Sequence, residues 1–153
     1  ADTFYAEIKA AITLDPELLE NPTLLNEAWI RLPGEVARMG YKYAEALKLF
    51  QGRERRQKAI WAATRDRIRM ELSANKSGAR VVLAEVDAQA FQDPAWQAAA
   101  EKEENAEKEM EMCRYVMEAL RAKRDALTNL SAAMRQERAT SMEPGFRDTT
   151  KFR

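Results

Sequence analysis

The sequence contains no histidine, and this absence removes much of the usual catalytic and metal-binding chemistry. Histidine is the most frequent general base near neutral pH and the most frequent protein ligand of transition metals. Catalytic triads, histidine-based zinc proteases and two-histidine iron sites are therefore excluded. An enzyme built on this chain would need carboxylates, lysine or tyrosine alone, and no such constellation is visible. We therefore expect a protein that is not an enzyme and that uses neither a metal nor another cofactor.

Cysteine and long apolar runs are also scarce. The single cysteine, Cys113, excludes an internal disulfide and favours a reducing compartment. No apolar run approaches the roughly 18 residues that a membrane-spanning helix needs, and no secretory signal peptide is visible. We therefore expect a cytoplasmic protein without a membrane partner.

Glycine and proline, which supply most turns in sheet proteins, number only five each. Alanine, glutamate, lysine, leucine and arginine dominate, and 33% of the residues are charged. This composition predicts an all-α protein. Helical periodicity and turn signals refine it to an elongated helical hairpin of two long helices, with short N-terminal and connecting helices.

Capping residues and breakers divide the chain into segments. We expect short helices up to residue 33, a helical hairpin core over 34–139, and a flexible tail over 140–153. Pro33, followed by Gly34, is expected to break or kink the helix. The tail carries two aromatic-basic pairs, Phe146-Arg147 and Phe152-Arg153, that a partner could order. The predicted helices cover 3–12, one or two turns after Asp15-Pro16, 23–32, 35–74, 81–91 and 94–139.

The last predicted helix repeats apolar residues at spacings of three and four, which is typical of a heptad seam. Helices of this length are more frequent in coiled coils and assemblies than in globular domains. We therefore expect a homo-oligomer that forms through coiled-coil-like packing. The residues expected at this oligomerisation seam are Met110, Cys113, Met117, Leu120, Leu127 and Met134.

An acidic run occupies the first part of the same predicted helix, between residues 101 and 111. It lacks the Asp, Asn and Gly loop that wraps a calcium ion. We interpret it as a solvated face, or as a face that pairs with the basic residues of 53–58 in a neighbouring helix.

The most informative feature of the chain is a basic stretch in a protein whose formal net charge is zero. Residues 53–80 hold nine Lys and Arg side chains and three carboxylates, which gives a local charge of +6. A concentrated basic surface on a neutral protein indicates a polyanion, and nucleic acid is the main candidate. A solvated face with internal Arg–Glu pairs and an acidic protein partner are the alternatives. The candidate DNA-binding residues are Arg53, Arg55, Arg56, Lys58, Arg65, Arg67, Arg69, Lys76 and Arg80.

Aromatic residues near this stretch could stack on the bases of a single strand, a contact that needs no particular sequence. The candidates are Trp61 and either Tyr41 or Tyr43. The alternative, which is strongest for Trp61, is packing in the core.

The segment 57–68 resembles the central segment of the phage UvsY-type recombination mediators. In that family a basic-x-Arg-aliphatic motif lies on a long helix just before a basic, glycine-containing loop. Here the motif is Arg65-Asp66-Arg67-Ile68 and the loop is 75–80. The segment 114–127 is similar to the C-terminal helix of the family, which ends in a segment like Met134-Arg135-Gln136-Glu137. The resemblance covers about residues 41–137.

This resemblance implies a non-catalytic mediator of phage homologous recombination. Such proteins bind single-stranded DNA, form ring-like homo-oligomers through their C-terminal helices, and help load a RecA-like recombinase onto strands covered by single-strand-binding protein. By motif, Arg65 and Arg67 take the DNA-contact role, and the other basic candidates are added from charge alone. The compartment would be the host cytoplasm if the protein is phage-encoded. The alternative is a non-enzymatic structural or adaptor protein of a phage or bacterial assembly, which binds an acidic protein partner.

Overall fold

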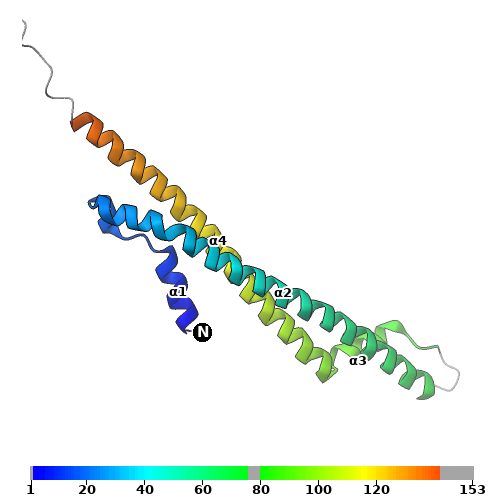
Figure 1. The fold of residues 1–153 in the computed structure, drawn as a ribbon. Coiled ribbons are helices and arrows are strands. Elements are labelled where there is room, and N and C mark those ends of the chain that lie inside the picture. Colours follow the sequence, from blue (N-terminus) through cyan, green and yellow to red (C-terminus); the bar gives the residue numbers. More distant parts are fainter. Residues whose placement is uncertain (1, 76–79, 142–153) are drawn as a thin grey trace, which may run out of the picture. The chain divides into compact units, whose positions relative to one another are not determined.

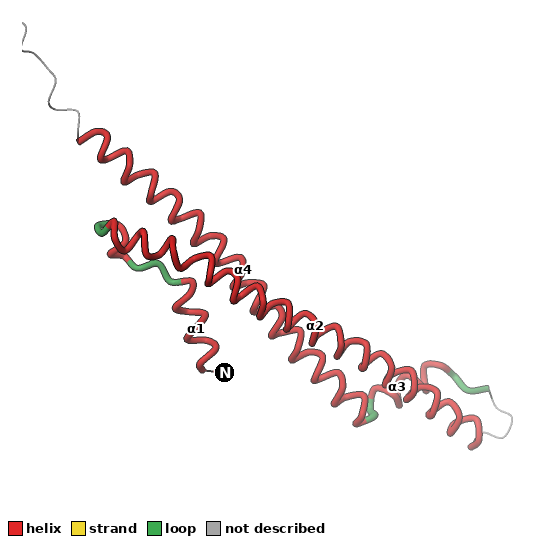
Figure 2. Tube along the Cα trace, in the orientation of Figure 1, coloured by secondary structure: helices red, strands yellow, loops and turns green. Residues whose placement is uncertain are grey.

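The computed structural model describes residues 2–75 and 80–141, and these residues form helices joined by short connections (Figure 1). The two long helices, α2 and α4, pack antiparallel as a hairpin, so the predicted all-α helical hairpin is confirmed. Figure 2 shows that the described part of the chain contains helices and loops but no strand. The elements are α1 (Asp2–Ile12), the 3-10 helix η1 (Pro16–Leu19), α2 (Pro22–Asn75), α3 (Leu83–Phe91) and α4 (Pro94–Ser141).

Three helices begin where an Asp or Asn precedes a proline, as the sequence predicts. The side chains of Asp15, Asn21 and Asp93 accept hydrogen bonds of 2.9 to 3.4 Å from backbone N–H groups two or three residues later. Each satisfies N–H groups that the first turn leaves unpaired, and the following proline has no N–H to lose. These three caps therefore fix the starts of η1, α2 and α4.

Pro33 does not break the helix, so the prediction of a break at this position is wrong. Helix α2 runs without interruption for 54 residues, with Pro33 inside it. An interior proline removes one backbone hydrogen bond and crowds the preceding turn, at a cost of about 3 kcal/mol. Leu32 and Met39, on either side of it, are buried in the core. Tertiary packing of these neighbours offsets a local cost that a sequence pattern alone cannot weigh.

The chain divides into two compact units, and each long helix contributes to both. The first unit comprises Ala1–Met39 and Val116–Arg153, and the second comprises Gly40–Tyr115. Each unit has a hydrophobic core of its own.

The core of the first unit joins α1 and η1 to the early part of α2 and the late part of α4. Its α2 residues, Leu25, Leu32 and Met39, lie seven positions apart and so share one side of the helix. The remaining members of this core are Ile8, Ala11, Leu18, Val116, Leu120 and Leu127.

The core of the second unit holds α3 against α2. Ile68 of α2 packs with Val86 and Ala90 of α3, and Trp61 and Leu72 lie against this cluster. The ring of Trp61 is also 4.7 Å from that of Phe91 and 5.1 Å from that of Trp96, centroid to centroid. Of the two interpretations of Trp61, core packing is therefore the one observed.

Candidate functional site

The structure separates the predicted DNA-binding residues into several groups. Arg53 to Arg69 lie on α2, and Arg80 is exposed in the connection before α3. Lys76 lies outside the described residues. The groups differ mainly in whether a carboxylate already accompanies the positive charge.

Arg65 and Arg67, the two arginines of the family-like motif, both have carboxylate partners. Arg65 Nε lies 2.6 Å from Asp87 Oδ1 of α3, and both atoms are shielded from solvent. Arg67 forms an ion pair with Asp93, the residue that caps α4. Its Nη1 atom also lies 3.3 Å from Oε1 of Glu71, one turn further along α2. These pairs connect α2 to α3 and to the start of α4. A DNA-contact role for the two arginines stays a prediction.

Lys58 pairs with Glu54 one turn earlier on the same helix, and its side chain remains exposed. Exposed pairs of this kind are weak in water, so the ammonium group stays available to another anion.

Four other arginines of α2 have no carboxylate at ion-pair distance among residues 2–75 and 80–141. Arg55, Arg56 and Arg69 are exposed, and Arg53 is half-buried. Guanidinium groups without an internal partner keep their donors for phosphate oxygens, which they bind in a two-pronged geometry. These side chains are therefore the best-placed anion ligands of the basic stretch.

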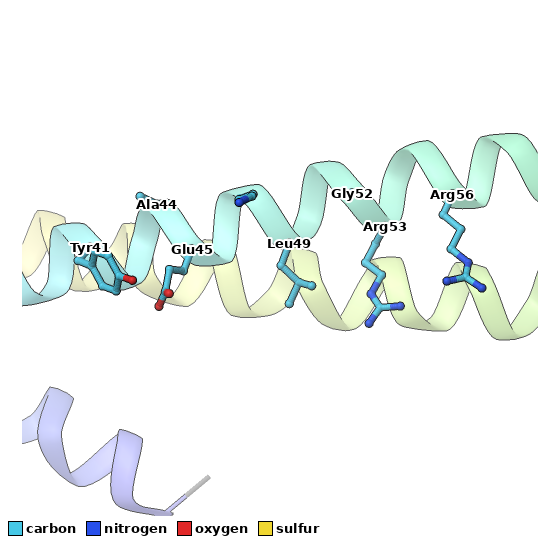
Figure 3. A pocket seen from close by; sticks show the side chains of 8 residues that line it. Tyr41, Ala44, Glu45, Leu49, Gly52, Arg53 and Arg56 are labelled. Carbon is cyan, nitrogen blue, oxygen red and sulfur yellow. The ribbon is translucent and has the colours of Figure 1, made fainter.

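One face of α2 is hollowed beside Arg53 and Arg56. The volume of this hollow is about 680 Å³, and the residues that line it recur every three or four positions, so they share one side of the helix. Figure 3 shows Tyr41, Leu49 and Arg56 projecting from that side. The lining residues are Tyr41, Ala44, Glu45, Lys48, Leu49, Gly52, Arg53 and Arg56.

A second, smaller hollow has a volume of about 210 Å³. Arg53 and Arg56 line both hollows, so the two adjoin each other. Its other walls are Ile60 of α2 and the small residues Ala95, Ala98 and Ala99 of α4, together with Lys102. We call the two hollows together the cationic groove. Its cations are Lys48, Arg53, Arg56 and Lys102.

Glu45 is the one acidic side chain among the residues that line the cationic groove. It accepts a hydrogen bond from the Tyr41 hydroxyl, and this bond, with the negative charge of Glu45, raises the pKa of Tyr41. Four cations and one carboxylate give the residues that line the groove a net charge of +3. An anion with an apolar part would satisfy both its charge and its exposed Tyr41 and Leu49.

Two of the groove's cations, Lys48 and Lys102, are not among the DNA-binding residues predicted from the sequence. Lys48 precedes the basic stretch, but it lies two helical turns before Arg56 on the same face, and helical periodicity could have included it. Lys102 belongs to the acidic run of α4 and looks like part of a solvated face. Only the packing of α4 beside α2 brings it to Arg53 and Arg56.

The predicted oligomerisation seam is largely buried within the single chain. Met110, Cys113, Leu120 and Leu127 are buried. Burial is the main cause that raises the pKa of the Cys113 thiol, and the negative charge of Glu109 raises it further. The remaining two seam residues, Met117 and Met134, pack partly buried against the core of the first unit. The apolar spacing of α4 is thus used inside the hairpin, and contact between copies through these side chains stays a prediction.

Within the described ranges, no group of three or more Cys, Asp or Glu side chains is gathered closely enough to hold a metal ion. No helix in those same ranges combines the length and the apolar character needed to cross a membrane.

Comparisons of the chain with protein-family models, with curated proteins and with solved structures find no match. The arrangement of the cationic groove is therefore the main basis for a functional conclusion.

Proposed function

We propose that this protein binds single-stranded DNA along the cationic groove and acts as a recombination mediator, helping to load a RecA-like recombinase onto the strand. The observation that carries the DNA-binding part is the groove itself. Arg53 and Arg56, without carboxylate partners in the described ranges, line two adjoining hollows together with Lys48 and Lys102. A strand lying there would neutralise these charges through its phosphates.

The physical basis of such binding is the release of counterions from the strand. Each phosphate that a lysine or arginine neutralises frees condensed cations, so affinity falls steeply with salt. Contacts to phosphates carry no sequence information, which suits a protein that must act on any strand.

In this proposal the arginines of α2 have two roles. Arg65 and Arg67, to which the family resemblance assigns DNA contact, first hold α3 and the start of α4 against α2 through their carboxylate partners. Arg53 and Arg56 make the primary phosphate contacts. Arg55 and Arg69 are exposed elsewhere on the same helix and could contact further phosphates.

The mediator role rests on the resemblance to the UvsY-type family. It brings with it the proposed partners, which are a RecA-like recombinase, single-strand-binding protein and further copies of this chain. In a homo-oligomer, several copies of a modest groove would bind one strand with a higher overall affinity than any single copy. The site of action would be the cytoplasm, of the host if the protein is phage-encoded.

The double variant Arg53→Ala/Arg56→Ala tests the proposal. We expect it to weaken binding of a fluorescein-labelled oligothymidylate in an anisotropy titration. The slope of log affinity against log salt should become shallower by about 1.4, because each single-strand phosphate contact contributes about 0.7.

The matched control is Arg135→Ala/Arg138→Ala, which removes two exposed arginines, also three residues apart, from the end of α4. It should leave both the affinity and the salt slope nearly unchanged. Equal effects of the two double variants would mean that net charge, and not the groove, attracts the strand.

A second candidate is an adaptor that binds an acidic protein partner. Exposed Tyr41 and Leu49 beside the groove's cations would also suit an acidic amphipathic helix. The same titration discriminates between the two functions, since an adaptor should bind the oligonucleotide only weakly at any salt concentration.

A further inference from the structure

The cationic groove contains an aromatic ring, that of Tyr41, which is not buried in the core. Tyr41 is 66% exposed although it lines the larger hollow, and Leu49, two turns further along the same face, is 44% exposed. A groove that bound phosphates alone would have no use for apolar side chains held in water. The pair therefore suggests that the ligand has an apolar, flat part as well as a charge.

The other aromatic candidates are less suited to stacking on a ligand. Trp61 and Trp96 pack against each other and against Phe91. Tyr43 is half-buried and does not line the hollow. Tyr115 is 61% exposed, but Arg114 already lies 5.5 Å above its ring and it is outside the groove.

We propose that Tyr41 is a stacking platform for an unpaired nucleobase of the strand whose phosphates lie on Arg53 and Arg56. This inference rests on the proposed function and deepens it. Tyr41 and Arg53 are twelve residues apart, about 18 Å along the helix axis. The strand would thus run along α2, with a base on the ring at one end and phosphates on the cations at the other.

The surroundings of Tyr41 favour this use of the ring. Its hydroxyl interacts with Glu45, one turn further on, which raises the pKa of Tyr41, and 66% of the residue is exposed, so a base can reach the ring. Figure 3 shows both side chains on the side of α2 from which Leu49 also projects. Leu49, exposed on the same face, lies along the helix between Tyr41 and the two arginines Arg53 and Arg56.

Stacking on Tyr41 would also explain a preference for single strands. A base in a duplex is already stacked on both faces and paired, so it cannot reach the ring unless the duplex opens. Every unpaired base has an aromatic face, so the contact is tolerant of sequence. Phosphates would supply the salt-dependent part of the affinity, and the base the part that salt leaves unchanged.

The test compares Tyr41→Ala and Tyr41→Phe with the control Tyr115→Ala, using oligothymidylate, an abasic strand of equal length and a duplex. We expect Tyr41→Ala to weaken oligothymidylate binding about tenfold. Binding of the abasic strand, binding of the duplex and the salt slope should hardly change. Tyr41→Phe keeps the ring and should bind nearly as the unchanged protein does, as should Tyr115→Ala.

An equal loss on the oligothymidylate and abasic strands, or no loss on either, would overturn the stacking role. If Arg53→Ala/Arg56→Ala weakens binding while Tyr41→Ala does not, this inference fails and the proposed function stands. If neither variant alters binding, both fail, and an acidic peptide becomes the better occupant. Circular dichroism identifies a variant that does not fold. In that case the affinities of the unchanged protein for the two strands are compared. It should bind oligothymidylate about tenfold more tightly than the abasic strand, and equal affinities would overturn the stacking role.

Discussion

Lys123 shows how one buried polar side chain can hold several helices together. Only 8% of its side chain is exposed, and its Nζ donates hydrogen bonds to the Ala11 carbonyl (2.5 Å) and to Glu35 (3.0 Å). The carbonyl lies at the end of α1, where the helix leaves such groups unpaired. One ammonium group therefore connects α4 to both α1 and α2, and its own burial is compensated by two acceptors.

We expect Lys123→Met to lower the free energy of unfolding by about 2–4 kcal/mol, because it leaves a carboxylate and a carbonyl without their donor. Thermal unfolding followed by circular dichroism measures this loss. The control Lys108→Met removes an exposed lysine that pairs with Glu104 on the same helix, and it should cost under about 0.5 kcal/mol. Equal stability of the two variants would contradict a structural role for Lys123.

The arginines of α2 show what a sequence can and cannot reveal about the site. The charge pattern identified Arg53 and Arg56 as candidate ligands, but it placed Arg65 and Arg67 in the same class. Arg67 has one local partner, Glu71, four positions away, but the acids that connect the two arginines to other helices, Asp87 and Asp93, are more than twenty positions away along the chain. Pairs between residues four positions apart can be predicted from local spacing, but these contacts between helices could not.

At the scale of the elements, local signals were sufficient for the starts of η1, α2 and α4. Asp15, Asn21 and Asp93 each cap a helix within three residues of their own position, so their effect is readable in the sequence. The effect of Pro33 was not readable, because it depends on a core formed with α1 and α4. The same limit applies to Lys102, whose partners in the groove belong to another helix.

Asp93 has two roles at the start of α4, and two substitutions separate them. Asp93→Ala removes both the cap and the pair with Arg67, and we expect it to destabilise the protein by about 1–2 kcal/mol. Asp93→Asn keeps a capping side chain and removes the charge, so its cost should be smaller. Urea unfolding curves measure both. A loss as large for Asp93→Asn as for Asp93→Ala would assign the stability to the ion pair alone.

At the scale of the whole molecule, the two units divide the chain's features between them. The cationic groove, from Tyr41 to Lys102, belongs entirely to the second unit. The contacts of α1 and of Lys123 belong to the first. Variants of the first unit therefore report on folding, and variants of the groove report on binding, with no residue shared between the two sets.

A substitution in the apolar repeat of α4 can show whether this repeat serves folding of the single chain or association between copies. Leu120 belongs to the predicted oligomerisation seam, yet it is 0% exposed in a single chain. We expect Leu120→Ala to lower the free energy of unfolding by about 2–5 kcal/mol through the cavity that it creates. If copies of the chain associate through other side chains, the number of subunits measured by light scattering at a temperature where the variant is folded stays the same. The control, Met112→Ala, alters an exposed residue of the same helix and should cost little. A folded Leu120→Ala variant with fewer subunits would show instead that α4 exchanges its partner in the hairpin for another copy of the chain.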